Sequence, residues 1–173
     1  MAESIARKKA FGIGFTDAVA VLFVLAVPAL SHLTPVPFYL LDPMRLAVLG
    51  ALLASRSRVN GLVLAAALPL ISFAVSGHPV FPKYLIIAAE LSVNVLLFVW
   101  LEKVFAGRRF GVGIAAFASI LLSKAFYYGL KALVLGAGLM QMELVSTALW
   151  VQLVVAVLIS AGFAIIWRSD RSW

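Results

Sequence analysis

The 173-residue chain contains no cysteine, only two histidines and few charged residues, which make up 12% of the total. The absence of cysteine excludes disulfides, thiol catalysis and cysteine-ligated metals, and it leaves the redox compartment open. No Gly-Lys-Ser/Thr phosphate-binding motif occurs. Soluble domains have about 25% charged and about 45–50% apolar residues, whereas hydrophobic residues make up 64% of this chain. This composition is typical of an integral membrane protein.

Acidic residues are also scarce, since seven Asp and Glu stand against fourteen Lys and Arg, which gives a net charge of +7. Most of the basic residues gather at alternate gaps between hydrophobic runs, an excess that cytoplasmic loops of membrane proteins carry. We therefore predict that both termini lie in the cytoplasm, and that the positive charge meets anionic lipid headgroups of the bilayer rather than nucleic acid. The basic clusters lie at residues 7–9, 56–58, 103–109 and 168–171, and the gaps between them at 31–37, 76–82 and 136–143 are bordered only by Lys83.

The hydrophobic runs predict an all-α integral membrane protein in which residues 1–173 form a single domain of six transmembrane helices. A helix needs about 20 residues to cross roughly 30 Å of hydrocarbon. Spans two and three are short, which fits helices that neighbours shield from lipid. We expect a compact bundle with an outward-facing pocket. The approximate spans are 15–33, 39–55, 61–75, 83–105, 112–135 and 144–167.

The first span follows a basic flank and superficially looks like a signal peptide. The apolar run from about Thr16 to Leu33 is long for a signal peptide, and no small-x-small cleavage site is obvious. We therefore predict that it is the first transmembrane helix. Asp17, near the start of this span, is predicted to complement the helix N-terminus.

Span five carries two lysines and two tyrosines at positions where hydrocarbon disfavours polar groups. Lys124, Tyr127, Tyr128 and Lys131 are spaced i, i+3, i+4 and i+7, so all four lie on one helical face. A lysine facing lipid costs on the order of 2.5–3.5 kcal/mol on insertion scales. The face is therefore expected to point into the bundle or into an outward cavity.

Polar residues of other spans fall in the same outer half of the membrane. Glu90 and Asn94 share a face of span four, Trp150 and Gln152 lie early in span six, and His78 lies in an outer loop. The inner halves of these spans are nearly featureless, which favours a pocket open to one side over a channel. The predicted substrate-binding residues are Glu90, Asn94, Lys124, Tyr127, Tyr128, Lys131, Trp150, Gln152 and His78.

Each of these assignments has a structural alternative. Glu90 and one of the two lysines, Lys124 or Lys131, can instead form a buried ion pair that sets helix register. The tyrosines and Trp150 can be aromatics of the membrane interface. The two lysines favour a ligand with a carboxylate or phosphate, and the aromatic residues favour a flat ring.

Three further features concern the outer loops and the helix faces. Asp42 and Arg45 are three residues apart and are predicted to pair, as a structural cap rather than a ligand contact. The two histidines lie in separate loops without a third ligand, so no metal site is predicted. Small residues recur at four-residue spacing, as in the series Ala156, Ser160 and Ala164. Such faces let helices approach closely, either within the bundle or against another membrane subunit.

The whole pattern resembles the S components of energy-coupling factor (ECF) transporters. The stretch 76–83 running into 84–90 and Asn94 is similar to the outer loop before their fourth helix and to that helix, and residues 144–152 have the character of their last span. The resemblance implies a six-helix protein of the bacterial or archaeal cytoplasmic membrane that captures a vitamin-sized small molecule. It implies no cofactor and no enzymatic activity in this chain, with a transmembrane coupling subunit and two ATPase subunits as partners.

One feature departs from the family pattern. Many S components carry an alanine-x-x-x-alanine face on their first helix, which docks onto the coupling subunit. Here Ala18 and Ala26 flank Leu22, so the strict spacing is broken. The departure bears on the docking mode and leaves the class unchanged.

Two other classes compete with a transport subunit. Rod-shape-determining membrane scaffolds have similar length and helix number and bind proteins of cell-wall synthesis, but a pure scaffold has little reason to bury two lysines and a carboxylate. An intramembrane enzyme would need a Ser/His pair or an aspartate cluster on converging spans, and both histidines fall in outer loops.

Overall fold

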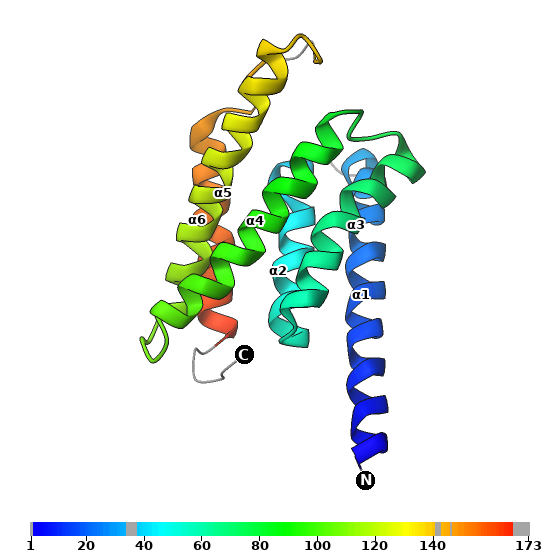
Figure 1. Cartoon of the computed structure of the whole chain (residues 1–173), viewed down its shortest axis with the longest axis vertical. Helices are drawn as coiled ribbons and strands as arrows, with labels where there is room; N and C mark the ends of the chain where they lie inside the picture. Colours follow the sequence, from blue (N-terminus) through cyan, green and yellow to red (C-terminus); the bar gives the residue numbers. More distant parts are fainter. Residues whose placement is uncertain (1, 34–37, 141–142, 146, 168–173) are drawn as a thin grey trace.

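The computed structural model describes residues 2–33, 38–140, 143–145 and 147–167. These residues form six α-helices and one short 3-10 helix, and no strand occurs among them (Figure 1). The all-α prediction is therefore confirmed for this part of the chain. In chain order the elements are α1 (Ala2–Leu33), η1 (Phe38–Leu41), α2 (Pro43–Ser55), α3 (Arg58–Ser76), α4 (Lys83–Val104), α5 (Gly111–Gly136) and α6 (Leu149–Ile166).

Five of the helices are long and apolar enough to cross a membrane, namely α3, α4, α5, α6 and the Gly12–Ser31 part of α1. The chain thus has the helices of a multi-pass membrane protein. The remaining helix, α2, has 13 residues. At a rise of about 1.5 Å per residue it is roughly 20 Å long, short of the roughly 30 Å of a hydrocarbon core. The region predicted as span two is therefore a 3-10 turn followed by a short apolar helix.

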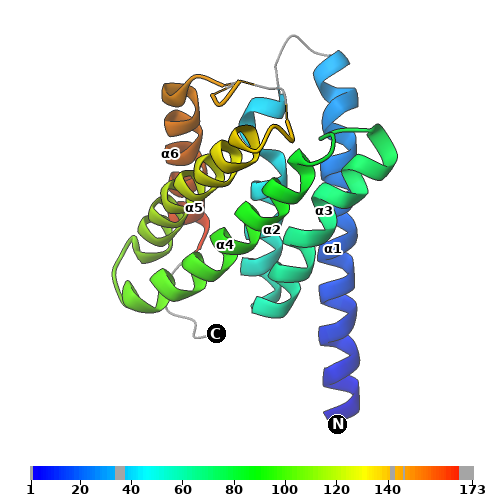
Figure 2. The same cartoon turned by 45° about the horizontal axis from the view of Figure 1, so that its top comes forward.

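Local backbone geometry sets the bounds of α2. Asp42 before it and Arg56 after it both adopt left-handed backbone conformations, with φ of 51° and 52°. Pro43 begins the helix, where its missing N–H leaves no bond unmade. The side chain of Ser57 then caps α3 by accepting from the backbone N–H of Asn60. Helix α2 is enclosed by α1, α3 and α4 (Figure 2), and its side chains such as Leu52 are fully buried.

The bundle has two distinct ends. At one end of the bundle α1, α3 and α5 end and α2, α4 and α6 begin, and we name it the cavity end. The opposite end carries the α2–α3 and α4–α5 turns, and we name it the basic end. Exposed cations of the basic end include Arg58, Lys103, Arg108 and Arg109. The side chains of residues 7–9 and the whole of 168–171 lie outside the described residues. Between the ends, α4 packs on α3 and α5, and α5 packs on α6.

Helix α1 continues well past the basic end. Its Asp17 accepts a hydrogen bond of 2.7 Å from the side-chain amide of Asn60, which lies in the first turn of α3. The helix begins at Ala2, fifteen residues before Asp17, which corresponds to about 22 Å of helix. Figure 1 shows this segment extending beyond the rest of the bundle. The prediction that Asp17 complements a helix N-terminus is therefore wrong, because Asp17 lies in mid-helix and joins α1 to α3.

Small residues bring α5 and α6 into close contact. A Cβ placed on Gly113 would lie 2.6 Å from the Cβ of Ala164 and 2.9 Å from the carbonyl oxygen of Ser160. Ala156 and Ser160, on the same α6 face, are buried. Of the two roles open for this face, the structure shows packing within the bundle.

The orientation in the membrane can be tested with single cysteines, because the chain has none of its own. His78 at the cavity end and Arg108 at the basic end are both exposed. If the basic end faces the cytoplasm, a membrane-impermeant maleimide added to intact cells should label His78→Cys. It should label Arg108→Cys only after permeabilisation. The reverse pattern would contradict the predicted orientation.

Candidate functional site

A cavity of about 420 Å³ lies at the cavity end. All six helices and η1 contribute to its wall, because it is bounded by the end of α1, the start of α2, the end of α3 and the facing halves of α4, α5 and α6. Apolar side chains such as Val24 and Ile159 form much of the wall. Its charged, amide, aromatic-hydroxyl and imidazole residues are Asp42, Arg45, His78, Lys83, Glu90, Lys124, Tyr127, Tyr128 and Gln152.

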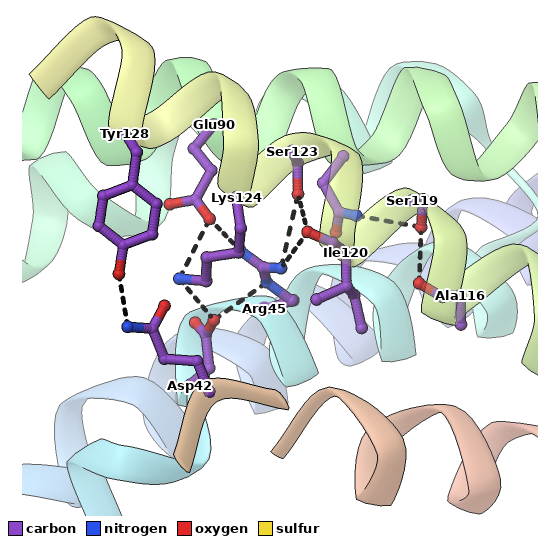
Figure 3. Close-up of polar contacts among 11 residues, drawn as sticks. Asp42, Arg45, Glu90, Ala116, Ser119, Ile120, Ser123, Lys124 and Tyr128 are labelled. Carbon is purple, nitrogen blue, oxygen red and sulfur yellow. Dashed lines mark hydrogen bonds and ion pairs between the residues drawn. The ribbon is translucent and has the colours of Figure 1, made fainter. Parts of the chain in front are cut away.

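Two acids and two bases from three helices and the η1–α2 junction form an ion cluster in this wall, which Figure 3 shows. The guanidinium of Arg45, fully buried, contacts Glu90 Oε1 through Nη2 and lies 3.0 Å from Asp42 Oδ2 through Nε. Lys124 Nζ lies 3.1 Å from Glu90 Oε1 and 3.3 Å from Asp42 Oδ2. Both carboxylates are thus shared by both cations, and the four formal charges cancel. We call these four residues the ion cluster.

The position of Asp42 depends on its left-handed backbone. Asp42 precedes α2 in the capping position, yet its side chain makes no capping hydrogen bond to that helix. The carboxylate instead turns to Arg45 and Lys124. The predicted Asp42–Arg45 pair is confirmed, while the predicted capping role is wrong. Aspartate adopts this conformation more readily than most non-glycine residues, and here it directs the carboxylate into the ion cluster rather than onto the helix.

A second polar group lies deeper, between α4 and α5. The amide nitrogen of Asn94 donates to Ser119 Oγ at 3.1 Å, and Ser119 donates to the carbonyl of Ala116 at 2.9 Å. Asn94 is fully buried, and its Oδ1 has no hydrogen-bond partner among the described residues. Asn94 therefore lies below the cavity rather than in its lining.

Aromatic and amide groups form the wall on the α5–α6 side. The rings of Tyr127 and Tyr128 meet edge to face with centroids 5.3 Å apart, and Lys124 Nζ lies 5.4 Å from the Tyr127 centroid. Gln152 donates to the hydroxyl of Tyr128 and, at 2.7 Å, to the carbonyl of Thr147. This wall presents flat rings beside the ion cluster.

Two predicted site residues, Lys131 and Trp150, lie outside the cavity lining. Lys131 is buried, and its Nζ donates to the carbonyl of Leu144 at 2.9 Å and lies 5.9 Å from the Tyr127 ring centroid. It is not the partner of Glu90, which pairs with Lys124 and Arg45. Trp150 is 69% exposed on the outer surface of α6.

His78 reaches the cavity from the α3–α4 loop. It is exposed at the mouth, and the hydroxyl of Ser72 donates to its backbone carbonyl at 2.8 Å. Within the described residues no three His, Asp or Glu side chains gather in a way that would hold a metal ion. The side chain of His32 lies outside the described residues.

The structure thus brings six of the nine predicted site residues into one cavity wall and adds Asp42, Arg45 and Lys83. Comparisons with family models, curated proteins and solved structures give no match for this chain. The volume of the cavity lies within the roughly 300–1,000 Å³ of small-molecule pockets, and convergent buried charges beside aromatic rings suit recognition of a polar ring compound.

Proposed function

We propose that the chain is the membrane-embedded substrate-binding subunit of an ECF-type importer for a vitamin-sized small molecule. The observation that carries the proposal is the cavity with its ion cluster at the end of the bundle opposite Arg58, Arg108 and Arg109. Basic loops face the cytoplasm, so the cavity would face outward. Intramembrane charges are costly and usually functional, which supports a binding role for the cluster.

The apolar core below the cavity also supports the proposal. Apolar side chains such as Leu52, Phe98 and Val112 fill most of the bundle between the ion cluster and the basic end, and the buried Asn94–Ser119 contact lies among them. A protein that conducts its substrate needs a polar path, whereas a subunit that reorients as a whole with its substrate does not. In this proposal, the ATP hydrolysis that drives reorientation belongs to the two partner ATPases.

A face of α1 offers a docking site for a coupling subunit. Ala18, Leu22 and Ala26 lie along one face, and all three are exposed, Leu22 to 66%. Alanines let a second helix approach closely. The long side chain of Leu22 between them would sit in a groove of the partner rather than at the contact of two small residues.

The proposal is tested by purifying the tagged chain from its native host in mild detergent, followed by mass spectrometry of the proteins and small molecules that accompany it. We expect a transmembrane coupling protein, two ATPase subunits and a retained small molecule. Recovery of cell-wall synthesis proteins with an empty cavity would contradict the proposal and favour the scaffold.

Two tryptophan variants locate the docking face in the same experiment. Ala26→Trp places a bulky ring on the exposed α1 face, and Ala161→Trp does the same on an exposed position of α6. We expect Ala26→Trp to lose the partner subunits while retaining the small molecule. Ala161→Trp should retain both, which controls for a general effect of the added ring.

A further inference from the structure

The two carboxylates of the ion cluster, rather than its two cations, constrain the chemistry of the ligand. Asp42 uses Oδ2 for both Arg45 and Lys124, and Glu90 uses Oε1 for both. The hydrogen bonds and ion pairs given for these two side chains use neither Oδ1 of Asp42 nor Oε2 of Glu90. Both residues line the cavity, and the side chain of Asp42 is 26% exposed and that of Glu90 3%, so a donor in the cavity would reach the Asp42 carboxylate most readily.

The cations of the cluster already have carboxylate partners. Arg45 is fully buried, and besides the two carboxylates its Nη1 approaches Ser123 Oγ and the carbonyl of Ile120, each at 3.5 Å. Lys124 directs two of its three N–H donors to Asp42 and Glu90. An anionic ligand would therefore compete with two carboxylates for cations that they already neutralise, and it would suffer their repulsion in a site of low dielectric.

We propose that the polar end of the substrate is a nitrogen-rich hydrogen-bond donor, neutral or cationic, such as an aminated or amidine-like ring that binds across Asp42 and Glu90. This inference rests on the proposed function and names the substrate class of the same cavity. Tyr127 and Tyr128 flank Lys124 and supply an aromatic wall for the ring. The anionic ligand that the lysines of the sequence suggest would be disfavoured at this position.

Lys83 is the remaining cation of the lining, and it lies apart from the cluster. It is the first residue of α4, and Glu90 follows two turns later, about 10 Å along the helix axis. Lys83 has no acidic partner among the described residues. An anion that binds at the mouth would bind there, so the Lys83→Gln variant isolates the ion cluster in the test below.

The test compares three probes of matched ring size against the purified protein in lipid nanodiscs by isothermal titration calorimetry: benzamidine, benzamide and benzoate. In wild type and in Lys83→Gln we expect benzamidine to bind at least about tenfold more tightly than benzoate, because charge-assisted hydrogen bonds to carboxylates are the stronger ones. Equal or tighter binding of benzoate in Lys83→Gln would overturn the proposal. Absence of binding by all three probes would overturn it too.

Substitution of the carboxylates gives the second arm. Glu90→Gln and Asp42→Asn should each weaken benzamidine about tenfold and strengthen benzoate, because a cation loses its counterion. Glu143→Gln removes an exposed carboxylate outside the cavity lining and should leave both affinities unchanged. An unchanged benzamidine affinity in both folded cavity variants would overturn the proposal. The wild-type comparison stands if the variants do not fold, and the co-purification experiment tests the transport role independently of either outcome.

Discussion

Replacing Arg45 with methionine is expected to lower the free energy of unfolding by about 3–5 kcal/mol, the usual cost of removing one partner from a buried ion pair. Arg45 has no exposed surface and contacts Glu90, which is only 2% exposed. The substitution leaves that carboxylate with Lys124 as its remaining cation among the described residues. Unfolding in mixed detergent–SDS micelles, followed by circular dichroism, measures the loss.

A second variant separates the loss of charge pairing from the loss of volume. Adding Glu90→Gln to Arg45→Met removes the uncompensated carboxylate and should recover part of the lost stability. Arg58→Met makes the same chemical change at an exposed site of the basic end, and should stay within about 0.5 kcal/mol of wild type. If Arg45→Met proved as stable as wild type, the cluster would not be an energetic unit of the fold.

A single methyl group at Gly113 is expected to disrupt the α5–α6 contact. The new Cβ would lie 2.6 Å from the Cβ of Ala164 and 2.9 Å from the carbonyl oxygen of Ser160. Neither atom can move aside by side-chain rotation, so α6 itself has to shift. We expect Gly113→Ala to cost about 1–3 kcal/mol, the range for overpacked cores. The same detergent–SDS titration measures it.

The matched control lies in the same helix. Gly129 is exposed on α5, and a Cβ there meets nothing within 4 Å. Gly129→Ala should be neutral or stabilising by up to about 1 kcal/mol, because alanine favours the helix. Equal effects at Gly113 and Gly129 would contradict the steric account, and would trace the change to helix propensity alone.

Part of this site could be predicted from the sequence by helical spacing. The charges of α4 and α5 are rare in apolar runs, so the cost of lipid exposure alone required them to face inward. The proximity of Glu90 and Lys124, 3.1 Å apart at Oε1 and Nζ, follows from that argument. The apolar runs likewise identify helices long enough to span a membrane.

The role of Asp42 and Arg45 could not be obtained in the same way. Their i, i+3 spacing predicts that they pair, but it does not reveal which other element the pair meets. The left-handed backbone at Asp42 interrupts the apolar run between η1 and α2. Apolar content gives no signal for such a break, so the run is predicted as one continuous span.

Lys131 shows that helical periodicity can also assign a residue to the site wrongly. It shares a helix face with Lys124, and both lysines lie near the Tyr127 ring. Its partner, however, is the backbone carbonyl of Leu144 in the connection between α5 and α6. Backbone carbonyls leave no trace in sequence composition, so the spacing of charges alone assigned Lys131 to the ligand.

The short, enclosed α2 has a consequence for biogenesis. A 13-residue helix with an arginine in its first turn is too short and too polar to partition alone into the bilayer. The turn at Arg56 and Ser57 joins it directly to the apolar α3, so the two helices can enter as a hairpin. The cluster residues on α4 and α5, Glu90 and Lys124, are synthesised after this hairpin. The ion cluster can therefore form only after α4 and α5 have joined the hairpin, before α6 completes the bundle.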